Sequence, residues 1–174
     1  MFKVEVKGLD ATIKKFETLA QNTQDDVQAS LNDFGDRVEL KAKQLVSANS
    51  SDEGILLRSI SKEYGNGNVS VKATARYAAY IEFGTRKYAA QYVSSLPPDW
   101  ASYAATFKGS AGGSFKEFVL SLMAWCRRKG IDEKAAYPIA RSIMINGIRP
   151  RPFLYPSVNA ELPKLIEDIK AIFK

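Results

Sequence analysis

The sequence contains no histidine and a single cysteine, and these absences exclude most familiar catalytic and metal-binding sites. Without histidine there can be no Ser-His-Asp or Cys-His constellation and no common His-based zinc site. Cys126 alone cannot form an intramolecular disulfide or a CxxC metal knuckle. Its helical spacing with Leu122 and Trp125 predicts a thiol packed in the core. We therefore expect no cofactor, no metal site and no enzymatic activity.

Long apolar runs are also missing. No stretch reaches the roughly 18 apolar residues that cross a bilayer, and the opening MFKVEVKGLD lacks the apolar segment of a signal peptide. We expect neither a membrane partner nor export by that route. The remaining composition is ordinary for a globular protein, with 45% hydrophobic and 25% charged residues in 174. This length predicts one domain, or one domain with a sizeable insertion.

The net charge of +6 is unevenly distributed. Residues 1–87 carry 13 basic and 12 acidic side chains, whereas residues 88–174 carry 12 basic and 7 acidic ones. Such a surplus indicates either an anionic neighbour, which is nucleic acid or an acidic protein surface, or simply a solvated face. Five basic residues in this half are predicted to contact the anionic partner: Arg127, Arg128, Lys129, Arg149 and Arg151.

The first half of the chain predicts a strand, helices and a hairpin. Phe2, Val4 and Val6 alternate with polar residues as in a half-buried strand. A helix capped by Asp10 follows, then a longer helical series over 24–47, and the polar residues 21–24 between them are expected to loosen the register. Gly35 in the long helix predicts a close packing contact there.

Asn66-Gly67 lies between two alternating segments, which is a strong hairpin signal. The expected register places Tyr64 opposite Val69 and Lys62 opposite Val71, with Glu63 and Lys72 as a diagonal pair. The period-2 pattern of residues 77–83 predicts a third strand. The expectation is α+β: a twisted antiparallel sheet of about four strands with a long N-terminal helix and a C-terminal helix packed on it.

Residues 88–146 are predicted to be an insertion into a core domain formed by 1–87 and 147–174. Its first part, 88–113, is rich in Tyr, Ser, Ala and Gly, and predicts an irregular aromatic arm that orders against a partner. Its second part, 114–146, predicts two helices, with Pro138 causing a 3₁₀ or bent start of the second. The prolines of 150–156 predict a stiff extended segment with Phe153 as a core anchor, followed by a helix with Pro163 in its first turn.

Two segments resemble a known family. YAAYIEFGT at 77–85, followed downstream by RPFLYP at 151–156, is similar to the paired signature of the neck or tail-completion (head–tail joining) family of tailed bacteriophages, typified by the tenth gene product of phage Hong Kong 97. The opening VKGLD before a long helix and LRSI before the hairpin resemble it too. The resemblance covers about 1–87 and 147–174, and the spacer between them is long compared with the commonest members.

The resemblance implies a non-enzymatic virion protein that assembles as a homo-oligomeric ring at the head–tail junction, after passing through the host cytoplasm during assembly. Its partners would be copies of itself, neighbouring connector or head-closure and tail proteins, and double-stranded DNA passing through the ring. The family-motif residues implied to be structural are Phe83, Gly84, Thr85, Pro152 and Phe153.

Several residues are candidates for contacts between subunits. Glu82, on the opposite face of the predicted strand from Phe83, is a candidate for an ion pair with Arg58 or Arg86 of a neighbour, and an ordinary exposed glutamate is the alternative. The aromatic arm offers Tyr92 and Trp100. Two other functions stay open: a nucleic-acid-binding module using the basic helical pair 114–146, and a metal-dependent nuclease. The carboxylate pairs lack the spacing of a metal site, which makes the nuclease the weakest of the three.

Overall fold

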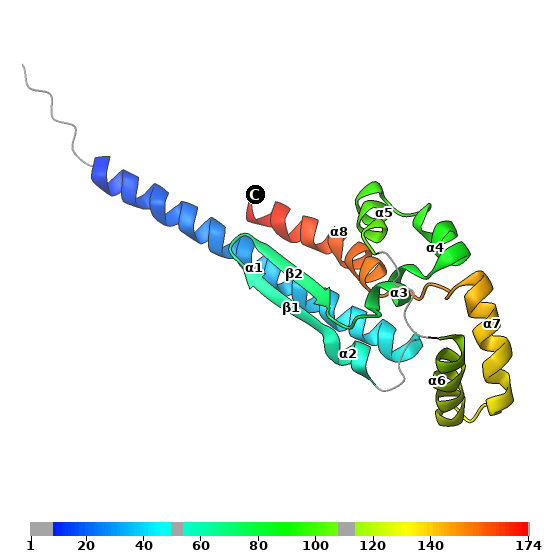
Figure 1. The fold of residues 1–174 in the computed structure, drawn as a ribbon. Helices are drawn as coiled ribbons and strands as arrows, with labels where there is room; N and C mark the ends of the chain where they lie inside the picture. Colours follow the sequence, from blue (N-terminus) through cyan, green and yellow to red (C-terminus); the bar gives the residue numbers. More distant parts are fainter. Residues whose placement is uncertain (1–8, 50–53, 108–113, 174) are drawn as a thin grey trace, which may run out of the picture.

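The computed structural model describes residues 9–49, 54–107 and 114–173, and within them the protein is mainly helical with one β-hairpin (Figure 1). In chain order the elements are α1 (Leu9–Asn49), α2 (Ile55–Ser59), β1 (Ile60–Gly65), β2 (Asn68–Ala73), α3 (Ala78–Phe83), α4 (Arg86–Val93), α5 (Pro98–Ala105), α6 (Phe115–Arg128), a 3₁₀ turn (Glu133–Ala135), α7 (Ala136–Asn146) and α8 (Leu154–Ile172). The predicted strand at Phe2, Val4 and Val6 lies outside the described residues.

Helix α1 is continuous over 41 residues, so the two helical series predicted on either side of 21–24 form one helix. The polar side chains there bond within the helix: Thr23 Oγ1 donates to Leu19 O at 2.9 Å, and Gln21 Nε2 donates to Asp25 Oδ1 at 3.0 Å. Polarity at these positions therefore reflects exposure rather than a break. The first half of α1 projects beyond the rest of the molecule, while its second half is covered by α8 and the hairpin (Figure 1).

The core forms where the covered half of α1 meets the hairpin, α3 and the start of α8. Val38, Ala42 and Val46 of α1 lie at steps of four and are fully or almost fully buried. Ala42 and Val46 share a cluster with Leu56, Ile60, Ala78 and Phe153. Helix α8 runs antiparallel to α1, since Glu161 pairs with Lys41 and Arg37, and Asp168 pairs with Arg37.

The hairpin has the predicted register, with Tyr64 opposite Val69 and Lys62 opposite Val71. The diagonal pair is also present, because Lys72 Nζ lies 2.5 Å from Glu63 Oε2. The close contact predicted at Gly35 is confirmed, since a Cβ added there would overlap Cγ2 of Val69. Glycine thus lets β2 lie directly on α1.

The third strand predicted for 77–83 is wrong, and these residues form helix α3. Ala78 and Glu82, four residues apart, are both buried, which is the spacing of a helix face. Within the described residues the sheet has two strands instead of about four. The predicted α+β class and the packing of a long N-terminal helix on the C-terminal helix are confirmed, but the fold is mostly helical.

The aromatic arm is more regular than predicted, because α4 and α5 occupy most of residues 86–105. Helices α6 and α7 pack on each other as a pair, and the 3₁₀ start before Pro138 is confirmed. Ser114 and Glu117 form a capping box at the start of α6, and Cys126 is fully buried as predicted. The division into a core domain and an insertion stays a prediction.

Helix α8 begins at Leu154, earlier than predicted, so Pro156 falls in its first turn and Pro163 lies inside it. Proline fits the first turn because the N–H groups there have no partner within the helix. Phe153, just before α8, is 1% exposed and is the predicted core anchor. Among the described helices, none is long and apolar enough to cross a membrane.

Candidate functional site

The two segments that carry the family signature lie against each other. The corner between α3 and α4 is joined to residues 148–151 by backbone bonds: Thr85 N donates to Ile148 O at 3.0 Å, and Arg151 N donates to Ile81 O at 2.7 Å. The Thr85 hydroxyl adds a third bond by accepting from Ile148 N at 2.7 Å. Segments more than 60 residues apart in sequence thereby form one junction, which we call the motif junction.

Two glycines permit this close approach. Gly84 has φ 74° and Gly147 has φ 92°, both in the region that favours glycine. A Cβ on Gly84 would lie 2.8 Å from Ile148 O, and one on Gly147 would overlap the carbonyl of Thr85. Any larger residue at either position would push the two segments apart.

Glu82 is the central polar residue of the motif junction and is only 2% exposed. Its Oε2 accepts from Phe153 N at 2.7 Å and Leu154 N at 2.9 Å, and its Oε1 accepts from Tyr155 N at 2.9 Å. These N–H groups belong to the start of α8, where a helix has unpaired donors and a positive dipole end. Glu82 therefore caps α8 from a distant part of the chain.

Burial raises the pKa of Glu82, and the three N–H bonds oppose that rise by stabilising the carboxylate. The predicted ion pair with Arg58 or Arg86 of a neighbour stays a prediction, but within the chain both carboxylate oxygens already have partners. The strand placement from which that ion pair was inferred is wrong, because Glu82 lies on the buried side of α3.

An aromatic cluster surrounds Phe83, which is 5% exposed. Its ring centroid lies 6.4 Å from Trp100, 6.2 Å from Tyr103 and 5.9 Å from Phe107. Trp100 also meets Tyr155 edge-on at 5.2 Å. The aromatic side chains of α5, predicted to order against a partner, thus pack in part on the motif junction of their own chain.

The other predicted subunit-contact residues are spread over the surface. Tyr92 on α4 is half-buried, and this burial raises its pKa to about 12. Arg58 on α2 and Arg86 at the start of α4 are exposed. Pro152, predicted to be structural, is half-buried between Arg151 and Phe153. Their contacts with a neighbouring subunit stay a prediction.

The five predicted basic contact residues form two groups rather than one patch. Arg127, Arg128 and Lys129 lie at the end of α6, and Arg149 and Arg151 follow α7, so the 11 residues of α7 separate the groups by about 16 Å. All five side chains are exposed.

Arg127, Arg149 and Arg151 each contact another residue of the chain. Arg127 forms a two-bond pair with Glu133, at 2.8 Å and 3.0 Å. Arg149 lies over the ring of Tyr88 at 5.3 Å, and Arg151 Nη1 donates to Asn49 O, the last residue of α1, at 2.6 Å. The arrangement holds helix ends in place as well as presenting positive charge.

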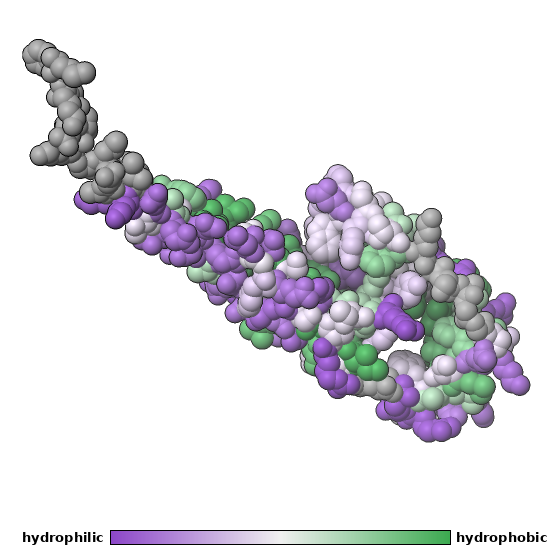
Figure 2. Space-filling model, turned by 60° about the vertical axis from the view of Figure 1, so that its left-hand side comes forward, coloured by the Kyte–Doolittle hydropathy of each residue, from purple (hydrophilic) through white to green (hydrophobic). Residues whose placement is uncertain are grey.

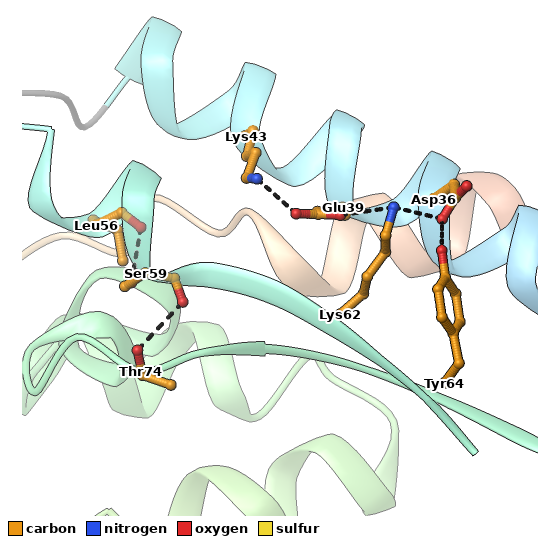
Figure 3. A network of polar contacts seen from close by, with 8 residues as sticks. All are labelled: Asp36, Glu39, Lys43, Leu56, Ser59, Lys62, Tyr64 and Thr74. Carbon is orange, nitrogen blue, oxygen red and sulfur yellow. Dashed lines mark hydrogen bonds and ion pairs between the residues drawn. The ribbon is translucent and has the colours of Figure 1, made fainter.

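A polar network that was not predicted from the sequence lies between α1 and β1 (Figure 3). Lys62 Nζ lies 2.6 Å from Asp36 Oδ1 and 3.2 Å from Glu39 Oε2, and the Tyr64 hydroxyl donates to Asp36. These contacts raise the pKa of Lys62 and lower the pKa of both carboxyls. The sequence did carry one indication of this network: Lys62 and Tyr64 are two residues apart in β1, so their side chains lie on the same face of the hairpin.

The chain was compared with known proteins. Residues 10–84 match the model of the family described as "HK97-gp10_like: Bacteriophage HK97-gp10, putative tail-component". Over these residues the chain has the sequence of a phage tail-component family. The predicted resemblance is confirmed there, and the match ends at Gly84, inside the motif junction. No curated protein and no solved structure matches the chain.

The HK97-gp10-like family is one of structural tail components, which implies a non-enzymatic role. Within the described residues, no group of three or more Cys, Asp or Glu side chains is placed to hold a metal ion. The carboxylates that have partners in the structure form ion pairs with Lys or Arg, or accept hydrogen bonds from N–H groups. These ion pairs and hydrogen bonds connect segments that are distant in the sequence and so stabilise the fold.

Proposed function

We propose that this protein is a structural component of a tailed bacteriophage that assembles as a homo-oligomeric ring at the head–tail junction. The ring joins the capsid connector to the tail, and double-stranded DNA passes through it. The family match over residues 10–84 is the observation that carries this proposal. The motif junction supports it, because hydrogen bonds connect the matched region to the start of the C-terminal helix within one subunit.

The two groups of basic residues are proposed to face a neighbouring protein rather than to grip DNA. Arg127 is already neutralised by Glu133, and Arg151 is bonded to the end of α1. A channel through which DNA slides is better served by weak phosphate contacts than by strong ones, since each phosphate contact adds a salt-dependent term to affinity.

Locating the chain in purified phage particles tests the proposal. A tagged copy should be found at the junction of head and tail, and particles assembled without the chain should have heads and tails that fail to join. A chain absent from purified infectious particles, or found in the capsid shell, would contradict the proposal. In a companion gel assay, DNA binding by the purified chain that disappears when 127–129 become alanine would favour the nucleic-acid module instead.

A further inference from the structure

Strand β2 has an open edge. The two-residue turn makes Gly65–Asn68 a hydrogen-bonded pair, so Asn68, Ser70 and Lys72 bond to β1. By the same alternation, the N–H and C=O groups of Val69, Val71 and Ala73 point away from β1. The hydrogen bonds of the described residues give these groups no partner. An unpaired edge of this kind accepts another strand.

Beside this edge lies an apolar groove of about 550 Å³. Its lining comes from α1, β2, α3, α5 and α8. The lining is mainly aliphatic and aromatic, and its partly exposed members include Phe34, Val69, Val71, Trp100 and Val158. A strand added to β2 would direct every second side chain into this groove.

The chain contains one segment outside the described residues that has the matching pattern. Residues 2–6 read Phe-Lys-Val-Glu-Val, with apolar residues at alternate positions. Phe2, Val4 and Val6 would fall on the same face as Val69, Val71 and Ala73. Lys3 and Glu5 would fall on the exposed face, beside Ser70 and Lys72, which are exposed. In the enlarged sheet, apolar side chains would therefore lie together on one face and polar side chains on the other.

The same chain cannot supply that strand. Val69 packs on Gly35, which lies 26 residues along α1 from its start at Leu9. At 1.5 Å per residue this distance is about 39 Å, whereas eight extended residues span at most about 29 Å. The projecting half of α1 runs away from the hairpin and its groove (Figure 1), so we look to a second copy of the chain for the added strand.

We propose that residues 2–6 of one copy add as a strand to the β2 edge of the next copy and fill its groove with Phe2, Val4 and Val6. The proposal rests on the proposed function and names the contact that links the subunits. The contact is head-to-tail, because strand and groove are different surfaces, and such contacts close into a ring when the rotation permits. The projecting half of α1 acts as the spacer between subunits.

Cysteine cross-linking in phage particles tests this contact. In a chain carrying Glu5→Cys and Ser70→Cys, the two thiols lie on the exposed face of adjacent strands, at a separation that a disulfide can span. Mild oxidation of particles should give a ladder of dimers and higher species on a non-reducing gel. Glu5→Cys with Lys72→Cys tests the register shifted by two residues. Adding Val4→Asp should reduce the ladder at least tenfold, whereas adding Lys3→Asp on the opposite face should leave it unchanged.

The single variants are matched controls, since each retains Cys126 and should stay monomeric on the gel. Dimers from Glu5→Cys alone would show strands pairing with each other, and a disulfide within one chain would show that our distance argument is wrong. Either result overturns the proposal, as does the lack of any cross-link in particles that contain the chain. Particles lacking the chain would instead contradict the proposed function, and the same gel on purified protein would then decide the strand addition.

Discussion

The two halves of α1 share one amphipathic pattern but have different surroundings. In the covered half, Val38, Ala42 and Val46 are at most 1% exposed, whereas Leu19 in the projecting half is 62% exposed. Figure 2 shows green, apolar atoms along one side of the projecting half and purple atoms along the other. An isolated helix of about 15 residues is marginal in water, so the projecting half depends on the covered half for nucleation. Residues of the covered half are therefore expected to contribute more to stability than those of the projecting half.

The largest effect is expected from removing the cap that holds α8 over the covered half. Glu82→Ala leaves three N–H groups at the start of α8 without an acceptor, of which that of Phe153 is buried and those of Leu154 and Tyr155 are partly buried. A buried group left unpaired costs about 1–3 kcal/mol and a partly buried one costs less, so the free energy of unfolding should fall by about 3 kcal/mol. Urea unfolding measures this change, and Glu82→Gln, which retains one carbonyl oxygen, should lose less.

The matched control for Glu82 is Glu117, which caps α6 at an exposed helix start. Glu117→Ala should cost only about 1 kcal/mol, because water replaces the lost acceptor there. Equal losses at the two glutamates would show that burial of the motif junction adds nothing.

A pair of truncations compares the two halves of α1 directly. Val46→Ala removes two buried methyl groups from the core and should lower the free energy of unfolding by about 2 kcal/mol. Leu19→Ala should change it by less than about 0.5 kcal/mol, because the side chain is exposed. Both values come from denaturant unfolding of the monomer. A large loss for Leu19→Ala would mean that the projecting half is covered in solution.

Because α1 and β2 are in close contact at Gly35, the effect of Gly35→Ala on stability should have opposite signs in the native protein and in a Val69→Ala variant. Alanine at position 35 favours helix by about 1 kcal/mol over glycine, but its Cβ would overlap Val69. Because overpacking costs about 1–3 kcal/mol, Gly35→Ala should destabilise the protein by about 1 kcal/mol. In a Val69→Ala background the same substitution should stabilise it. Thermal unfolding of the four proteins gives the sign, and stabilisation in the native background would contradict the close contact.

The smallest effect concerns pH. Lys41 and then Arg37 lower the pKa of Glu161 below its ordinary value of 4.5. A lowered pKa means that the stabilisation is full above pH 4.5 and is lost as the pH falls through the pKa of the folded state. Glu161→Gln should flatten the acid side of the stability curve. Parallel curves for Glu161→Gln and the native protein would show that the ion pairs contribute nothing.

Elements with local signals could be predicted from the sequence. The Asn66-Gly67 hairpin and its register depend on a turn that the two residues encode by themselves. The burial of Cys126 and the 3₁₀ start before Pro138 follow from periodicity and from the geometry of proline. The contact at Gly35 was predicted as well, although its partner Val69 was not.

Residues 77–83 could not be assigned in the same way, since their apolar side chains fit period 2 as well as a short helix. Glu82 favours the helix, because its carboxylate accepts hydrogen bonds from N–H groups about 70 positions later in the chain. A carboxylate in the middle of an apolar segment gave no local indication of those partners. The same distant contact starts α8 at Leu154, ahead of Pro156.

The sequence by itself determined the amphipathic stripe of α1, the hairpin, the family resemblance and the surplus of basic residues in the second half, because each is set by neighbours within a few positions. Among the described residues, the tertiary structure alone decided that one half of α1 is covered and the other exposed, that Glu82 caps α8, and that the outer edge of β2 has no strand beside it. These depend on which distant segments meet, and that is settled by the burial of apolar area and the pairing of backbone groups across the whole chain.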